Sequence, residues 1–137
     1  HYVRPLPEDD GSAVPDAFKK INLSLTSFFD LSLNIEGNML TLAGKDGEIW
    51  YRAERESWSN ISRKVHCSPF YTEKDSIDTP VIGAWGVKNG VLTIRVYEIE
   101  FLEEDTLTLT EAEDGIHVSF ANTTIPSNPR DYVKKVI

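Results

Sequence analysis

The residues of this chain best suited to chemistry include one histidine–cysteine pair. His66 and Cys67 are adjacent, and Glu73 and Asp75 follow shortly after them. Thiolate, imidazole and carboxylate groups together suit a transition metal. Structural zinc sites usually have two separated ligand pairs, however, and only one is present. We therefore predict no metal site, and we expect His117, which alternates with apolar neighbours, to be a surface histidine.

Two glutamates form a second group of candidates. Glu98 and Glu100 are two residues apart on an expected strand, so their side chains share a face. Glycosidases use paired carboxylates, but strand neighbours on one face are commonly just exposed, and we predict no catalytic residue. Glu98 also shares its face with Leu92 and Ile94, so we expect it to point inward. There it could pair with an arginine or bind a polar group of a ligand.

Three tryptophans complete the candidate residues. Trp50, Trp58 and Trp85 are large side chains for a small domain. They could fill the core or contact another domain, or they could line a cavity for a small apolar molecule. These tryptophans and Glu98 are the predicted ligand-binding residues, and the sequence predicts no cofactor.

The acidic composition restricts the kinds of partner. The 137 residues carry a net charge of −8. Nucleic acids and anionic membrane surfaces bind basic patches, and none is visible, so we expect neither partner. No stretch approaches the roughly 20 apolar residues of a spanning helix. The acidic run at 98–114 is expected to form a solvated hairpin rim, and the single cysteine excludes an intramolecular disulfide.

The elements that must position these candidates are β-strands. Apolar and polar residues alternate over most of the chain, which is typical of strands with one buried and one wet face. Asn89-Gly90 favours a two-residue hairpin turn, and Asp114-Gly115 marks another turn. The expected strands cover residues 21–25, 31–35, 39–43, 48–53, 81–88, 91–101, 106–112 and 116–121, with one or two short strands in the irregular region 54–79.

The strand pattern predicts the fold class and the domain boundaries. An antiparallel up-and-down meander best removes its edges by closing, so we expect an all-β, eight-stranded, lipocalin-like barrel. A two-sheet β-sandwich is the alternative. Residues 1–17 form a linker or lead-in, 18–124 the β-barrel domain, and 125–137 a C-terminal tail with one possible helical turn. The chain begins at His1 without a leader, and we expect it to be a segment of a longer protein.

Several short motifs resemble one protein family. The segment from Arg4 to Asp9 reads RPLPED and resembles the stretch that follows the catalytic domain in bacterial serine hydrolases of the penicillin-binding-protein and class C β-lactamase-like group. Other segments resemble the family's C-terminal accessory domain: residues 48–58, Gly83-Ala84-Trp85, 91–95, Glu98 with Phe101, 106–109, and Val118-Ser119-Phe120.

The resemblance implies an accessory role without catalysis. The family's nucleophile motif, Ser-x-x-Lys, is absent from this chain. We therefore expect a non-catalytic accessory domain that packs on, or modulates, a serine-hydrolase domain of the same full-length protein. The resemblance also implies a bacterial source and favours an extracytoplasmic location. The alternative function is a lipocalin-like binder of a small apolar molecule.

Overall fold

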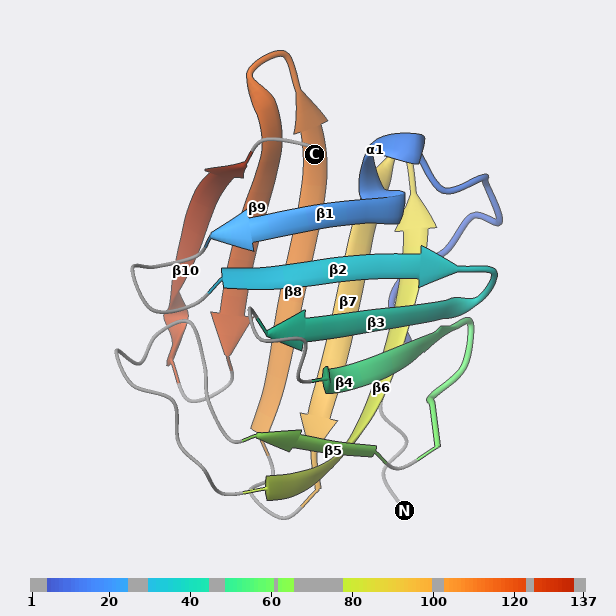
Figure 1. The fold of residues 1–137 in the computed structure, drawn as a ribbon, viewed down its shortest axis with the longest axis vertical. Coiled ribbons are helices and arrows are strands. Elements are labelled where there is room, and N and C mark those ends of the chain that lie inside the picture. The colour runs from blue at the N-terminus through green and yellow to red at the C-terminus, as the bar shows by residue number, and fades with distance from the viewer. Residues whose placement is uncertain are drawn as a thin grey trace.

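The strands form one strongly bent sheet (Figure 1). The computed structural model describes residues 5–24, 30–44, 49–60, 62–65, 78–99, 103–122 and 125–134. Its elements are α1 (Asp16–Lys19), β1 (Lys20–Ser24), β2 (Asp30–Glu36), β3 (Met39–Gly44), β4 (Ile49–Arg55), β5 (Ser62–Val65), β6 (Asp78–Lys88), β7 (Val91–Glu98), β8 (Glu103–Ala112), β9 (Gly115–Asn122) and β10 (Ile125–Lys134).

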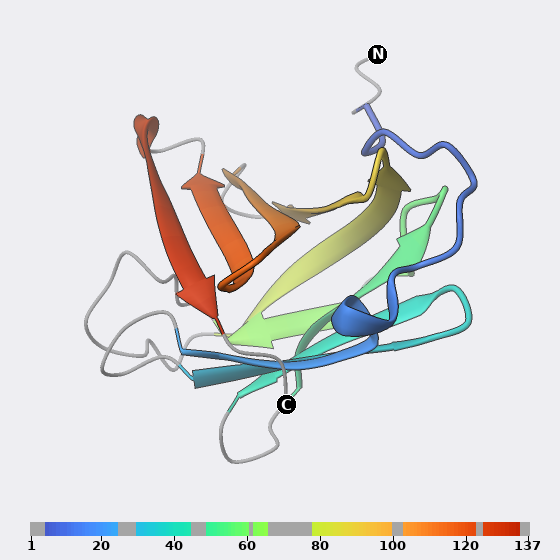
Figure 2. The same ribbon diagram turned by 90° about the horizontal axis from the view of Figure 1, so that it is seen from above.

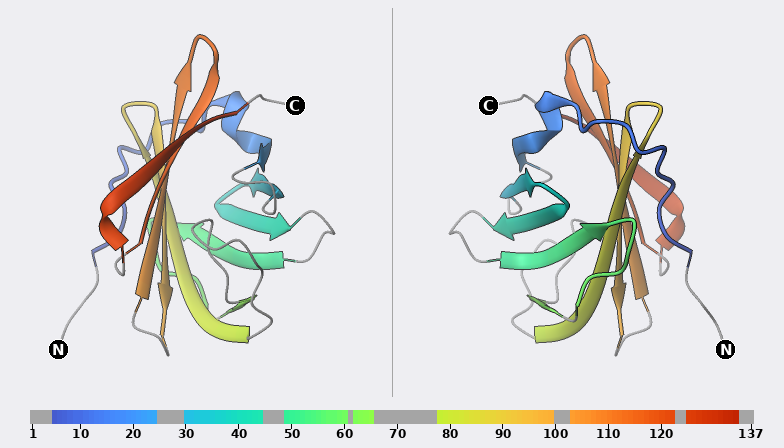
Figure 3. Two further views of the ribbon diagram at one scale, coloured as in Figure 1. Left: turned by 90° about the vertical axis from the view of Figure 1, so that its left-hand side faces the viewer. Right: turned by 90° about the vertical axis from the view of Figure 1, so that its right-hand side faces the viewer.

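The sheet folds over itself into two layers. Strands β1 to β4 form the first layer, and β6 to β10 form the second and run crosswise to it (Figure 1). The side views show the two layers facing each other across the interior (Figure 3). Within each layer, neighbouring strands pair antiparallel. The inner faces of both layers therefore share one core.

The layers join at a corner between β4 and β6. These strands pair in parallel and over only two positions, Glu54 with Ala84 and Arg55 with Trp85. A parallel pair needs a long connection, and residues 56–77 supply it. Part of this connection is β5, which pairs with the first residues of β6. The corner is thus the shortest pairing along the main path of the sheet.

Strand alternation places the core between the layers. On β7 every second residue is buried, beginning with Leu92, and on β3 the same pattern buries Leu40 and Leu42. Phe18 of the short α1 is fully buried and joins this cluster. The hydrophobic cluster takes residues from α1 and from both layers, so burial of apolar surface holds the layers together.

The predicted all-β, barrel-like fold is confirmed, but the barrel does not close. In the described part of the chain the sheet has ten strands and forms a curled half-barrel, as the view from above shows (Figure 2). Since β4 pairs with β6, there is one sheet and not two separate ones. The prediction of a wholly antiparallel meander is wrong at this one pairing.

The C-terminal segment also differs from the prediction. Residues expected to form a tail with a helical turn instead form β10, which pairs with β9. Pro126 and Pro129 make this segment look unlike a strand. Proline is tolerated at the edge of a sheet, where a missing N–H breaks no ladder. Across the described ranges, the structure contains no helix long and apolar enough to cross a membrane.

Candidate functional site

The first described residues of the chain are hydrogen-bonded to the sheet. Residues 5–12, which we call the strap, run beside β6 on the outside and lead to α1 (Figure 2). The N–H of Asp10 donates to the carbonyl of Val87 at 2.9 Å, and the N–H of Val87 donates to Oδ1 of Asp9 at 3.3 Å. The strap therefore satisfies the backbone of β6 on its free side, which would otherwise be an open edge.

A second acid holds the turn between β6 and β7. Oδ2 of Asp10 accepts the N–H of Asn89 at 2.9 Å, and its Oδ1 accepts the N–H of Ser12 at 2.9 Å. Asn89 and Gly90 have φ values of 54° and 78°, as the predicted turn requires. Hydrogen bonds from the Ser12 side chain and from the N–H groups of Asn89 and Ser12 lower the pKa of Asp10 to about 2.

Asp9 also forms an ion pair with Arg55 at the end of β4. Nε of Arg55 donates to Oδ2 at 3.0 Å and Nη2 donates to Oδ1 at 2.8 Å, a two-pronged geometry that suits guanidinium and carboxylate. Their side chains are only 14% and 6% exposed. The guanidinium also donates to the carbonyl of Ser12 at 2.6 Å. Arg55 holds the pKa of Asp9 well below its usual range, and Asp9 raises the pKa of Arg55.

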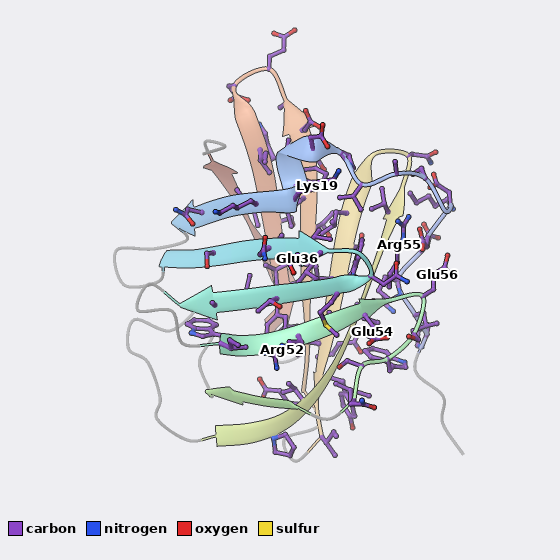
Figure 4. All side chains as sticks on the ribbon, turned by 45° about the vertical axis from the view of Figure 1, so that its right-hand side comes forward. Lys19, Glu36, Arg52, Glu54, Arg55 and Glu56 are labelled. Atoms are coloured by element: carbon purple, nitrogen blue, oxygen red, sulfur yellow. The ribbon has the colours of Figure 1, made fainter. Side chains whose placement is uncertain are left out.

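The ring of Trp85 packs against the Arg55 guanidinium of this ion pair. The guanidinium carbon of Arg55 lies 5.3 Å from the centre of the Trp85 ring, within the range of a cation–π interaction. The ring is fully buried, and its Nε1 donates to the carbonyl of Asn38 at 3.0 Å. Figure 4 shows Arg55 pointing toward the strap from the end of β4. We call Asp9, Asp10, Arg55 and Trp85 the clasp.

The rest of the strap lies against the second layer. Pro7 is buried, and Nη1 of Arg95 on β7 donates to the carbonyl of Pro5 at 3.1 Å. A Cβ at Gly86 would lie 2.5 Å from the carbonyl oxygen of Glu8, so the absence of a side chain there lets the strap approach β6. The strap is therefore packed against β6 and β7 and hydrogen-bonded to both strands.

The clasp is suited to holding a chain segment. Each polar group in it is engaged by a neighbour in the ion pair or the hydrogen bonds above. In the described ranges, no group of three or more His, Cys, Asp and Glu side chains could hold a metal ion. The ion pair and hydrogen bonds of the clasp fix the placement of residues 5–12.

Two of the predicted ligand-binding residues, Trp85 and Glu98, lie apart on one hairpin. Trp85 lies opposite Ile94 on the β6–β7 hairpin, whereas Glu98 lies opposite Val81. Four residues along a strand amount to about 13 Å, so Trp85 and Glu98 are separated along the hairpin. Trp58 is half-buried in the segment that follows β4.

Trp50 is buried in the core and lies in a β-bulge of β4. Leu42 pairs with Tyr51 and the next residue, Ala43, pairs with Ile49. Trp50 is therefore an extra residue on β4. Such a bulge bends the strand and re-aims its side chains. As a result two successive residues, Trp50 and Tyr51, are both buried, at 5% and 2% exposed.

Glu98 points inward, as predicted, and has an acidic neighbour. Glu98 on β7 and Asp105 on β8 are 2% and 3% exposed. The register pairs Asp105 with Val96, so the two acids are diagonal neighbours on the inner face. The acidic run at 98–114 is therefore not one solvated rim, because it has buried acids at one end and exposed acids at the β8–β9 turn.

The remaining sequence candidates have ordinary surroundings or lie outside the described residues. His117 is 43% exposed, and its Nε2 lies 3.1 Å from Oδ1 of Asp114, which is a surface arrangement. Five candidate residues lie outside those that the structure describes, namely His66, Cys67, Glu73, Asp75 and Glu100.

Sequence reasoning missed three of the four residues that build the clasp, since only Trp85 is among the predicted site residues. Asp9 and Asp10 were treated as part of a linker, and Arg55 was not singled out. The signal present was the RPLPED motif, which ends at Asp9. Comparison of the chain with protein-family models, with curated proteins and with solved structures gave no match.

Proposed function

We propose that this is a non-catalytic accessory domain of a bacterial serine hydrolase related to penicillin-binding proteins and class C β-lactamases. The observation that carries the proposal is the anchored strap. Its sequence resembles the segment that follows the family's catalytic domain, and Asp9 and Arg55 fix it to the sheet. A segment that served only as a flexible linker between two domains would need no such contacts with the sheet.

Anchoring the strap would give the neighbouring domain a defined position. Domains joined by a flexible linker are free to reorient, because few contacts cross the boundary. Here the chain is fixed from Pro5 onward by the bond from Arg95 and by the clasp. A catalytic domain on the N-terminal side would therefore be held beside the outer face of β6 and β7.

The two candidate functions differ in what they require of the interior. Trp50 and Trp85 belong to the hydrophobic cluster that is buried between the layers. The alternative, a binder of a small apolar molecule, requires open apolar volume. Native mass spectrometry of this chain separates the two. We expect no bound molecule, and a stoichiometric apolar ligand would favour the alternative.

The coding sequence on the 5′ side of this segment tests the proposal directly. We expect it to encode a domain with the Ser-x-x-Lys and Tyr-x-Asn motifs. A start codon and signal peptide immediately before His1 would overturn the proposal.

The longer protein then allows a test of the strap itself. Arg55→Met removes the clasp, so we expect small-angle scattering to show a broader distribution of distances between the domains. The matched control is Arg52→Met, because Arg52 is exposed on the same strand. Equal scattering of the two variants would show that the clasp does not fix the domains.

A further inference from the structure

The two layers have few direct backbone links at their corner. β4 and β6 pair at two positions. Beyond them, the N–H of Glu56 reaches the carbonyl of Trp85 at 3.4 Å, and the N–H of Ser59 donates to the carbonyl of Gly83 at 2.8 Å. Glu56 takes this position with a φ of 64°, a left-handed conformation that is unfavourable for a residue other than glycine. The corner is short and includes a strained residue.

The strap bonds to both sides of this corner. On the second layer it engages Val87, Asn89 and Arg95. On the first layer it engages Arg55, through Asp9 and through the carbonyl of Ser12. The strap therefore connects the two layers, in addition to the corner, the core and the bond from Trp85 to Asn38.

The carboxylate of Asp9 accepts hydrogen bonds from both layers. Oδ1 of Asp9 accepts Nη2 of Arg55 from the first layer at 2.8 Å and the N–H of Val87 from the second layer at 3.3 Å. The same oxygen accepts the N–H of Gly11 at 3.1 Å, which fixes the strap's own turn. Moving Asp9 would thus break one bond to each layer at once.

We propose that the strap is a latch that closes the corner between the layers. When it is docked, Asp9 holds the end of β4 against the edge of β6. When the strap is drawn away, the Glu56 and Ser59 links open, and the corner loosens while the core still joins the layers. Any partner attached on the N-terminal side would therefore control the shape of the half-barrel through the strap.

This inference goes beyond the accessory role and does not require it. The latch concerns bonds within this chain, so it is tested on this chain alone. Failure of the accessory proposal would leave the latch standing, and failure of the latch would leave a domain whose strap is only an anchor.

Amide hydrogen exchange, measured residue by residue by NMR, tests the latch. In Asp9→Asn we expect exchange at Val87 to quicken on the order of tenfold or more, because its acceptor loses charge. The decisive amide is that of Ser59, which donates to the carbonyl of Gly83 on β6; the amide of Glu56 is a secondary probe, because its side chain also bonds to Asp9. They should quicken together with Val87, whereas the amides of β8 and β9 should not change.

A matched variant controls for the lost charge. Asp16→Asn also removes one carboxylate, from an exposed pair with Lys19 whose side chains are 94% and 54% exposed. It should leave Glu56 and Ser59 at their original rates. Faster exchange at Val87 with unchanged Glu56 and Ser59 in Asp9→Asn would overturn the proposal.

A second variant covers the case in which Asp9→Asn does not fold. Gly86→Ala keeps the acid but places a Cβ where the Glu8 carbonyl lies. It should displace the strap and quicken the same two amides. Protection at Glu56 and Ser59 that persists after the strap amide of Asp10 has lost its own would contradict the latch.

Discussion

The corner between β4 and β6 differs from the pairing of β7 with β8 in what holds it together. β7 and β8 pair over seven positions from Leu92 to Glu98, and their alternating buried residues form a continuous inner face. The corner has two positions and relies on a buried tryptophan, an arginine and an acid from a distant segment. Where the backbone ladder is short, side chains replace it.

This difference indicates where substitutions should have specific effects. A long ladder distributes its stability over many equivalent hydrogen bonds and cross-strand pairs. The corner concentrates it in a few groups, so single changes there should be more damaging than changes on exposed strand faces. The following predictions separate the two cases, from the largest expected effect to the smallest.

Arg55→Met should be the most destabilising change. It leaves the carboxylate of Asp9 nearly buried without its cation, and breaking a buried pair in this way lowers the free energy of unfolding by about 3 kcal/mol. Urea unfolding measures the effect. Arg52→Met, on the exposed face of β4, should change it by less than about 0.5 kcal/mol. Similar losses of unfolding free energy in both variants would mean that the ion pair of Arg55 with Asp9 contributes no more to stability than an exposed arginine.

Gly83→Ala should weaken the corner by a steric route. The new Cβ would lie 2.6 Å from the backbone oxygen of Arg52 and 3.1 Å from Cβ of Ala53. Since the oxygen belongs to the backbone, β4 must move, and overpacking of this kind lowers the free energy of unfolding by about 2 kcal/mol. Calorimetric unfolding checks this value. A variant as stable as the native chain would show that β4 and β6 are not tightly apposed here.

The contribution of Asp9 should depend on pH. Its pKa is lowered in the folded protein, chiefly by Arg55. A carboxyl group with a lowered pKa stabilises the fold above its unfolded pKa of about 3.9, and this stability is lost as the pH falls further. The native chain should therefore exceed Asp9→Asn in stability at pH 7 by about 2 kcal/mol, and the gap should shrink below about pH 4. A gap that stays constant between pH 7 and pH 2.5 would contradict the ion pair.

Trp85→Phe should have the smallest effect of the four. Phenylalanine keeps most of the buried ring but removes the Nε1 donor to the carbonyl of Asn38 and weakens the stacking under Arg55. The loss should be about 1 to 2 kcal/mol. Unfolding by urea measures it, and an unchanged midpoint would show that neither interaction contributes.

The sequence predicted the regular part of the fold well. In β7, β8 and β9 the alternation of residue types places leucine, isoleucine and valine inside, and the Asn89-Gly90 turn has the expected positive φ angles. These features are local, since neighbouring residues determine them. Glu98 follows the same alternation, which is why its burial was predictable.

The corner and the clasp could not be predicted in the same way. Asp9 and Arg55 are 46 residues apart in the chain, and nothing in the local pattern relates them. The bulge at Trp50 interrupts the alternation that predicts which side a residue faces. The parallel pairing of β4 with β6 depends on how residues 56–77 return the chain, and this is a tertiary property.

A double-mutant cycle of Asp9→Asn and Arg55→Met tests the central claim most directly. The claim is that the strap belongs to the fold because this pair binds it to the first layer. Asp9→Asn should partly relieve Arg55→Met by removing the uncompensated charge, so the two losses should be non-additive by about 2 kcal/mol in urea unfolding. Losses that add to within about 0.5 kcal/mol would contradict the account.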